Sequence, residues 1–280
     1  MTVFGEGSGA VMTGARNGSQ PPDTIDTSVP HSARIWNYWL GGKDNFQADR
    51  EAGDEFLQYY PQQLDKARAC RHFLSRAVRF LVLEEGIRQF LDVGTGLPTA
   101  DNTHEVAQRA APEARIVYVD NDPLVLAHAR ALLTSSPDGA TSYIDADMHD
   151  PEAILTAATK TLDLEQPIAL LMIGVLGHVA DYDEALSIVR RLLDGLPSGS
   201  YLVETDGTDS SLEYLAAIEM YRDSGGVPYN VRTHDQIAGF YAGLELIDPG
   251  VVPIHLWRPE ANVFGQAPDV SESGGVGRKP

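Results

Sequence analysis

The stretch Phe90-Leu91-Asp92-Val93-Gly94-Thr95-Gly96 decides the fold of this 280-residue chain. It is a short apolar run that ends in a carboxylate and then in glycines at alternate positions. A second apolar run, Ile116–Val119, ends in Asp120. Runs of this kind are typical of strands in an α/β domain, whose carboxyl ends form a crevice that binds an adenosine group.

The carboxylate of Asp92 indicates which adenosine compound fits this crevice. It lies two residues before the first glycine, where it would repel a pyrophosphate and attract a ligand that carries positive charge. S-adenosylmethionine carries a sulfonium and an ammonium group and no phosphate. We therefore expect S-adenosylmethionine as the cofactor, with Asp92 holding its ammonium group directly or through water.

Short apolar runs alternate with helical patterns from residue 89 onward. The strands are expected at residues 89–93, 115–119, 141–145, 168–173 and 200–204, and a closing hairpin at Leu244–Ile247 and Val251–Trp257. The helices are expected after Asn102, after Asp122, and over residues 183–194 and 234–241. Strands that alternate with helices predict an α/β fold with a doubly wound, mostly parallel sheet and helices on both faces.

The composition divides the chain into four regions. Residues 1–25 and 261–280 are poor in apolar side chains and rich in small or polar ones, so both segments are expected to be disordered. Residues 26–86 carry two amphipathic helical patterns and predict an N-terminal helical cap. Residues 87–260 predict the nucleotide-binding domain, with an insert at residues 206–235.

Composition and charge argue against several kinds of partner. The chain has 40 acidic and 21 basic residues, a formal net charge of −19 and no basic stripe, so no nucleic acid is expected to bind. Cys70 is the only cysteine and the eight histidines are scattered, so no metal site is expected. The longest apolar run, Ile168–Leu176, is much shorter than the ~20 residues of a membrane span. Because the N-terminus has no signal-peptide pattern, we expect a soluble cytoplasmic protein without membrane contacts.

Polar or glycine residues follow each expected strand, at the edge where the carboxyl ends of parallel strands meet. Gly94 and Gly96 allow the backbone to approach a ligand closely. Asp120 is placed to accept hydrogen bonds from both ribose hydroxyls, and Asp147 to accept one from the adenine amino group. The backbone N–H of Met148 is placed to donate to a ring nitrogen. The expected cofactor-binding residues are Asp92, Gly94, Thr95, Gly96, Asp120, Asn121, Asp147 and Met148.

Each of these residues also has a simpler interpretation. The glycines alone fit a tight turn, Asp120 fits a helix cap, and Asp147 fits a solvated loop. Their joint occurrence in the right order favours the cofactor site. A nicotinamide dinucleotide is a weaker alternative for the ligand. The sequence fingerprint of dinucleotide-binding sites needs a glycine or alanine at position 99, and this chain has a threonine there. In addition, Pro98 disturbs the start of the helix whose N–H groups would face a pyrophosphate.

The chain also resembles a known family. Asp92–Gly96, Val117–Asp120 and Asp145–Met148 resemble the motifs of class I, Rossmann-like S-adenosylmethionine-dependent methyltransferases. More narrowly, the chain resembles a bacterial methyltransferase family long described as a domain of unknown function. The resemblance covers residues 25–260. The segments that carry it are Ser32–Phe46, Phe90–Glu105, Tyr118–Leu133, Pro249–Pro253 and Trp257-Arg258-Pro259. The resemblance implies a seven-stranded sheet and the same cofactor, and leaves the substrate open. One departure is Gly177, which separates Leu176 from His178, where the family usually has a Leu-His pair followed by an aromatic residue.

Methyl transfer from a sulfonium depends mainly on positioning, and a base is needed only if the acceptor must lose a proton. His178 is the candidate for that base, with a structural role as its alternative; His31, His104 and Glu204 are weaker candidates. The acceptor is expected under the N-terminal helices. The candidate contacts are Arg34, Asn37, Tyr38 and Lys43, with Tyr214, Tyr221 and Tyr229 from the insert as another wall.

The predicted function is methyl transfer to a small molecule. A cofactor-binding sensor without turnover and a dinucleotide-dependent oxidoreductase are the alternatives, and the oligomeric state is left open.

Overall fold

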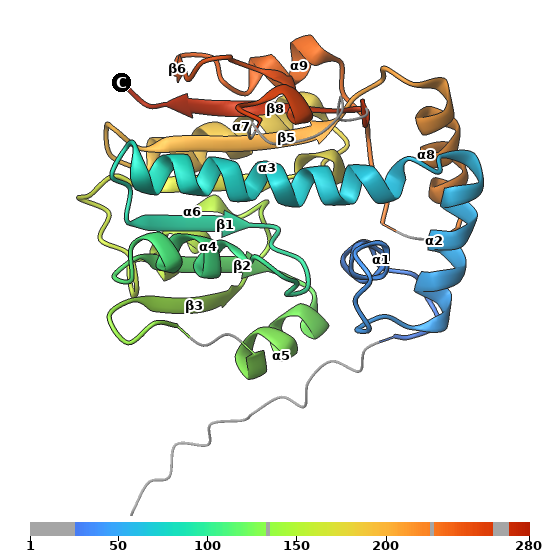
Figure 1. Cartoon of the computed structure of the whole chain (residues 1–280), viewed down its shortest axis with the longest axis horizontal. Coiled ribbons are helices and arrows are strands. Elements are labelled where there is room, and N and C mark those ends of the chain that lie inside the picture. Colours follow the sequence, from blue (N-terminus) through green and yellow to red (C-terminus); the bar gives the residue numbers. More distant parts are fainter. Residues whose placement is uncertain (1–25, 133–134, 225–226, 260–268) are drawn as a thin grey trace, which may run out of the picture.

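A computed structural model describes residues 26–132, 135–224, 227–259 and 269–280, and has helices packed on both faces of one central sheet (Figure 1). The strands are β1 (Gln89–Val93), β2 (Arg115–Asp120), β3 (Ala140–Asp145), β4 (Ala169–Ile173), β5 (Tyr201–Gly207), β6 (Glu245–Leu246), β7 (Val252–Pro253) and β8 (Glu272–Arg278). The α-helices are α1 (Ser32–Trp39), α2 (Gln47–Tyr59), α3 (Gln63–Leu83), α4 (Thr103–Ala110), α5 (Pro123–Leu132), α6 (Pro151–Ala158), α7 (Tyr182–Asp194), α8 (Leu212–Asp223) and α9 (His234–Gly239). Two short 3₁₀ helices are η1 (Leu176–His178) and η2 (Ile254–Leu256).

The sheet has the order β3-β2-β1-β4-β5-β8-β6, and β7 pairs with β8 as an eighth strand. Strands β1 to β5 are parallel to one another, whereas β8 is antiparallel to β5, β6 and β7. The predicted Rossmann-like fold with a mostly parallel sheet is confirmed. Val93 pairs with Val119, so the residues that follow β1 lie beside the end of β2.

Both faces of the sheet are covered by helices. Successive residues of a strand point to opposite faces, so Phe90 packs in one apolar layer with α3 and α4, while Leu91 packs in the other with α6 and α7. Burial on both faces explains why the strands read as nearly continuous apolar runs. The helix caps that the sequence indicated at Asn102 and Thr233 are present as capping boxes.

Helix α3, which we assigned to the N-terminal cap, packs across the sheet. Phe73, Ala77 and Leu81 are fully buried in the same layer as the sheet residue Phe90. Helices α1, α2 and α8 form a separate group beside the carboxyl ends of the strands (Figure 1), with its own apolar cluster. We therefore propose that the cap ends before α3 and includes α8 from the insert at residues 206–235.

The prediction that residues 261–280 are disordered is wrong for the segment that forms β8. This strand is inserted between β5 and β6. Its glycines, which suggested disorder, are needed for close packing, because a Cβ at Gly274 would overlap the carbonyl oxygen of Glu204. The predicted disorder of residues 1–25, and of residues 261–268, lies outside the described residues.

The predicted closing hairpin is also wrong. Its two apolar runs contain β6 and β7, and each of these strands pairs with β8 rather than with the other. The second run continues into η2 and ends at Trp257, and both Ile254 and Trp257 pack in the α3 layer. Among the described residues, no helix is long and apolar enough to cross a membrane.

Candidate functional site

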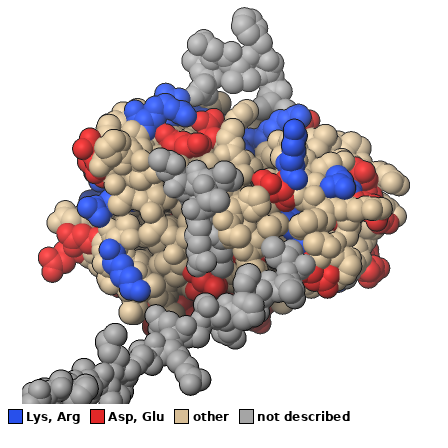
Figure 2. All heavy atoms as spheres, turned by 90° about the horizontal axis from the view of Figure 1, so that it is seen from below, with Lys and Arg blue, Asp and Glu red and all other residues tan. Residues whose placement is uncertain are grey.

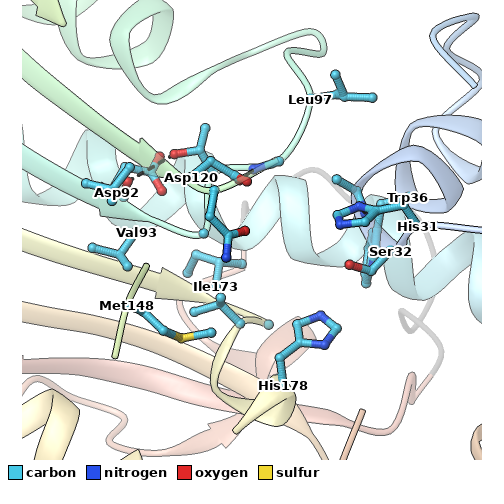
Figure 3. A pocket seen from close by; sticks show the side chains of 18 of the residues that line it. His31, Ser32, Trp36, Asp92, Val93, Leu97, Asp120, Met148, Ile173 and His178 are labelled. Carbon is cyan, nitrogen blue, oxygen red and sulfur yellow. Dashed lines mark hydrogen bonds between the residues drawn. The ribbon is translucent and has the colours of Figure 1, made fainter. Parts of the chain in front are cut away.

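A cavity of about 420 Å³ lies at the carboxyl ends of β1, β2, β3 and β4 and is covered by α1. Figure 3 shows Asp92 and Asp120 on the sheet side, His31, Ser32 and Trp36 on the α1 side, and His178 below. All eight residues expected to bind the cofactor line this cavity, namely Asp92, Gly94, Thr95, Gly96, Asp120, Asn121, Asp147 and Met148. The strand order brings them together from three separate strand ends.

The turn after β1 is fixed by close packing and by hydrogen bonds to β2. Gly94 has a φ of +73°, and a Cβ at this position would collide with the side chain of Val175. Its N–H donates to the carbonyl oxygen of Val119 at 2.9 Å. Gly96 has a φ of +67°, and a Cβ there would meet no atom within 4 Å. The first glycine is therefore required by packing, and the second leaves open space beside the cavity.

Asp120 connects the end of β2 to this turn. Its Oδ2 accepts from the N–H of Gly96 at 2.8 Å, and its Oδ1 accepts from the N–H of Asp122 at 3.0 Å. Burial raises the pKa of Asp120, although both backbone hydrogen bonds act in the opposite direction. A carboxylate has about four acceptor positions, so two remain for a diol.

Asp92 is the most enclosed acid of the cavity, with 5% of its surface exposed. The Thr103 hydroxyl donates to its Oδ2 at 2.6 Å. Burial raises the pKa of Asp92 to about 6, against the opposing effects of this hydrogen bond and of the Arg71 charge. A bound cation would favour the ionised carboxylate.

Sequence reasoning did not identify Arg71 as part of the site. This side chain of α3 lines the cavity and donates to the carbonyl oxygens of Ala100 and Asp101 at 3.1 and 2.9 Å, while its Nε has no partner. The signal was present, because Arg71 is a charged residue within the apolar stripe that includes Ala67 and Leu74.

Asp147 lies at the outer part of the cavity and is exposed. Its Oδ1 accepts from the backbone N–H of His149 at 2.9 Å and lies 2.5 Å from the Nδ1 of the same residue. Partial burial would raise the pKa of Asp147, but these hydrogen bonds outweigh it and lower the pKa. His149, which the sequence did not single out, also lines the cavity.

His178 ends η1 and faces the cavity from below (Figure 3). Its Nδ1 lies 3.0 Å from the carbonyl oxygen of Pro228. Since a carbonyl only accepts, Nδ1 carries the proton and Nε2 is left with a lone pair. Burial lowers the pKa of His178, which favours the neutral ring. Packing explains why position 177 is a glycine, because a Cβ there would overlap the ring of Tyr229. Tyr229 in turn packs edge-on against His178.

The expected acceptor contacts are only partly brought together. Asn37 lines the cavity, whereas Arg34, Tyr38 and Lys43 do not. The cavity side of α1 and the following turn consists of Ser32, Ala33, Trp36, Asn37 and Leu40, which follow helical spacing. The other polar residues therefore lie on different sides of α1 or beyond it.

Arg34, Tyr38 and Lys43, which do not line the cavity, make other hydrogen bonds or face solvent. Arg34 donates to the carbonyl oxygens of Asp26 and Val29 at 3.1 and 2.9 Å. Tyr38 donates to Asp54 at 2.6 Å, and Lys43 is exposed. These contacts indicate that Arg34 and Tyr38 hold the cap together.

A second, narrow cleft of about 40 Å³ lies next to this larger cavity, in which we expect the cofactor and which is called here the cofactor cavity. The two share Ser32, Trp36 and His178 as lining residues. The rest of this cleft, called here the aromatic cleft, is formed by Ile35, Trp39, Phe56, Gln63, Tyr214, Ile218, Tyr221 and Tyr229. The tyrosines that we expected as another wall therefore line this cleft, and none of them lines the larger cavity. Within the described part of the chain, no cluster of side chains is suited to hold a metal ion.

Comparison with known proteins agrees with this fold and identifies the family. The profile of the S-adenosyl methyltransferase family matches residues 18–280. A DUF574 family protein from Streptomyces avermitilis has 47% identity, with 91% of this chain and 99% of that one covered and a TM-score of 0.86. A protein from Thermobifida fusca, described as a candidate methyltransferase, has 40% identity, covers 93% and 99% of the two chains, and gives a TM-score of 0.84.

A more distant structure agrees with the fold only. An S-adenosylmethionine-dependent methyltransferase from Anabaena variabilis has 10% identity and a TM-score of 0.51, with 89% of this chain and 95% of that one covered. A search of curated proteins gave no match. With the family matched over most of the chain, the dinucleotide alternative is no longer supported. The chain belongs to the S-adenosyl methyltransferase family, and it is an S-adenosylmethionine-dependent methyltransferase.

Proposed function

We propose that this enzyme transfers the methyl group of S-adenosylmethionine to a cytoplasmic small molecule that enters between α1 and η1. The observation that carries the proposal is the pair of adjoining cavities. The larger one is lined by the eight expected cofactor residues, and the smaller one adjoins it at Ser32, Trp36 and His178. A narrow cleft lined mainly by aromatic side chains suits a small acceptor better than a macromolecule.

The cofactor roles in this proposal follow from chemistry and position. Asp92 binds the ammonium group, Asp120 binds the ribose hydroxyls, and Asp147 and the Met148 backbone bind the adenine ring. Asn121 and the 94–96 turn complete the pocket wall. The bound cofactor supplies a methyl group already activated by the sulfonium. The task of the protein is to hold the acceptor in line with that methyl group and exclude water.

The charge distribution supports a small, non-polymeric acceptor. On the face shown in Figure 2, the described basic side chains stand in small groups beside acidic ones and form no continuous stripe. Binding of a phosphate backbone needs such a stripe. The net charge of −19 points in the same direction.

Calorimetry and labelled turnover test the proposal together. We expect S-adenosylhomocysteine to bind and NAD not to bind. With methyl-labelled S-adenosylmethionine, label should enter a compound of low molecular mass when the protein is incubated with a metabolite pool. Binding without transfer to any small molecule would contradict the proposal and favour the sensor alternative. Transfer of the label to protein or RNA alone would also contradict it.

A further inference from the structure

The wall of the aromatic cleft comes from three different parts of the chain. Trp36 lies on α1, Phe56 on α2, and Tyr221 on α8. The rings meet at tilted or edge-on angles, with Trp39 and Phe56 centred 5.2 Å apart and Phe56 and Tyr221 6.4 Å apart. Such a wall presents ring faces and ring edges to a flat ligand. Another aromatic ring packs favourably against a surface of this kind.

Two residues that line this cleft each carry a buried polar atom without a hydrogen-bond partner. The atoms are Oε1 of Gln63, which is 2% exposed, and the hydroxyl of Tyr221, which is 6% exposed. Buried polar groups in native proteins are nearly always paired, so an unpaired amide oxygen and an unpaired hydroxyl in one cleft point to a ligand. Because an amide oxygen only accepts, the ligand must bring at least one N–H or O–H group.

The cleft is electrically neutral on its inner surface. No carboxylate or ammonium group is among its lining residues in the described part of the chain. Charges of both signs lie behind the wall, and they are paired with one another. Lys66 lies 3.8 Å from the ring centre of Tyr214 and 2.9 Å from Glu272, and the Tyr229 hydroxyl donates to Asp206, which pairs with Arg232. A cationic acceptor would therefore lose its hydration without gaining an unpaired counter-charge.

His178 lies where the aromatic cleft meets the cofactor cavity. Its Nδ1 is held by the Pro228 carbonyl at 3.0 Å, so the lone pair of Nε2 is free to take a proton. The neutral ring that burial favours is the form that can act as a base. A hydroxyl acceptor uses such a base, because its oxygen must lose a proton when it is methylated.

From these features we propose that the aromatic cleft, together with the part of the larger cavity that adjoins it at Ser32, Trp36 and His178, forms the acceptor subsite, and that this subsite takes a neutral phenol with a second hydroxyl on the ring. This rests on the proposed function above. One hydroxyl lies beside His178, and its oxygen attacks the methyl carbon. The carbon–sulfur bond breaks with its electron pair left on sulfur, which gives the ether and S-adenosylhomocysteine. The phenolic proton passes to Nε2 of His178 and then to water. The second hydroxyl hydrogen-bonds with Gln63 and Tyr221.

A panel of defined acceptors tests this assignment in the full-length enzyme. The panel contains catechol, hydroquinone, phenol, aniline, cyclohexanediol and dimethylaminoethanol, and the readout is product mass after incubation with S-adenosylmethionine. We expect methyl transfer to a dihydric phenol, with a KM about tenfold lower than that of phenol. Transfer only to the amines or only to the saturated diol would overturn the phenol assignment and leave the proposed function standing.

Tyr221→Phe removes one hydroxyl and keeps the ring. We expect it to raise the KM for the dihydric phenol about tenfold, to leave the KM for phenol nearly unchanged, and to leave the affinity for S-adenosylhomocysteine unchanged. Tyr59→Phe is the matched control, because Tyr59 is an exposed tyrosine of α2 that does not line the cleft. Equal effects of Tyr221→Phe on both phenols would show that the hydroxyl does not contact the ligand, and would overturn this part of the proposal.

His178→Gln separates a base from a structural histidine. For a base we expect kcat to fall at least 100-fold at pH 7, with the acidic limb of the pH profile lost and activity partly restored by added imidazole. A similar fall without imidazole rescue and with the pH profile retained would overturn the role as base. If the wild-type enzyme binds S-adenosylhomocysteine but methylates nothing in the panel and nothing in a metabolite pool, the proposed function itself fails.

Discussion

The backbone N–H of Gly96 donates to the carboxylate of Asp120 at 2.8 Å, so the turn after β1 and the end of β2 hold each other in place. A second backbone donor, Asp122, fixes the other carboxylate oxygen at 3.0 Å. The acid is therefore oriented before any ligand arrives, which reduces the entropy lost on binding.

Asp120→Ala is expected to weaken binding of S-adenosylhomocysteine about 10- to 100-fold. The physical reason is the loss of two hydrogen bonds to a charged acceptor, each worth roughly 1.5–3 kcal/mol, partly offset by water. Calorimetric titration measures the change. Asp145→Ala is the matched control, because Asp145 is exposed at the end of the adjacent β3 and does not line the cavity. Equal affinities of the wild type and Asp120→Ala would place the ribose contact elsewhere.

Gly94→Ala should destabilise the fold more than Gly96→Ala does. Both substitutions place a side chain at positive φ, which costs about 1–2 kcal/mol, but only the first also collides with Val175. We expect about 2–5 kcal/mol for Gly94→Ala and about 1–2 kcal/mol for Gly96→Ala, measured by urea unfolding. Val175→Ala should recover part of the loss in the Gly94 variant and none in the Gly96 variant. The same cost at both glycines would exclude the collision as the cause.

Cofactor affinity should decrease as the pH falls through about 6. The pKa of Asp92 is raised to about 6 by burial, so the acid is protonated below that pH and loses its attraction for the ligand ammonium group. We expect the Kd to rise by up to tenfold per pH unit between pH 6 and 5. Asp92→Asn should bind more weakly at pH 8 and show a flatter profile. Other groups that act on this acid are Arg71, Asp120 and Thr103. Because the Thr103 hydroxyl donates to the carboxylate, Thr103→Val should raise the pH at which the cofactor affinity falls.

The raised pKa of Asp92 gives the stability of the ligand-free protein a pH dependence opposite to that of cofactor affinity. A raised folded-state pKa means that the folded chain binds this proton more tightly than the unfolded chain does. The contribution of Asp92 to stability is therefore largest below about pH 4 and is lost as the pH rises to about 6. Unfolding of wild type and Asp92→Asn across this range should show the difference. If the free energy of unfolding had the same pH dependence in both proteins, the raised pKa of Asp92 would not contribute to stability in this way.

Lys66→Met is expected to destabilise the fold by about 3–5 kcal/mol, because it leaves the buried carboxylate of Glu272 without its partner at 2.9 Å. Adding Glu272→Gln should recover much of that loss, since the amide oxygen can still accept from Thr205. Asp65→Asn, which breaks an exposed ion pair with Arg68, should cost less than about 1 kcal/mol. A double variant as unstable as Lys66→Met alone would show that the pair does not act as a unit.

The parallel part of the sheet was predictable because its local signals agree with its packing. Strands covered on both faces consist mostly of apolar residues, and their helices start at clear caps such as Asn102 and Asp122. Strand β8 was missed because its sequence is dominated by glycines, and its stability comes from pairing with strands distant in the chain. No local pattern carries that information.

That the eight expected cofactor residues line one cavity was predictable for the same reason, since each residue follows a strand and the strand ends meet at one edge. The surroundings of the expected acceptor contacts were not predictable. Arg34 and Tyr38 looked like free polar groups, but they bind the backbone near Val29 and the side chain of Asp54. Which side of α1 faces the cavity depends on how the cap docks, which is a tertiary property.

The position of β8 also bears on how the protein is made. Ribosomes deliver the chain from its N-terminus, so β1 to β5 and the 94–96 turn emerge well before residues 272–278. Until β8 arrives, β5 has an open edge, and β6 and β7 lack the strand that they pair with. A nascent chain that stops short of residue 272 would contain every residue of the cofactor cavity and still present an unpaired edge to other chains. Premature termination should therefore yield aggregates and substrates for chaperones and proteases, even though the lost segment lines neither cavity.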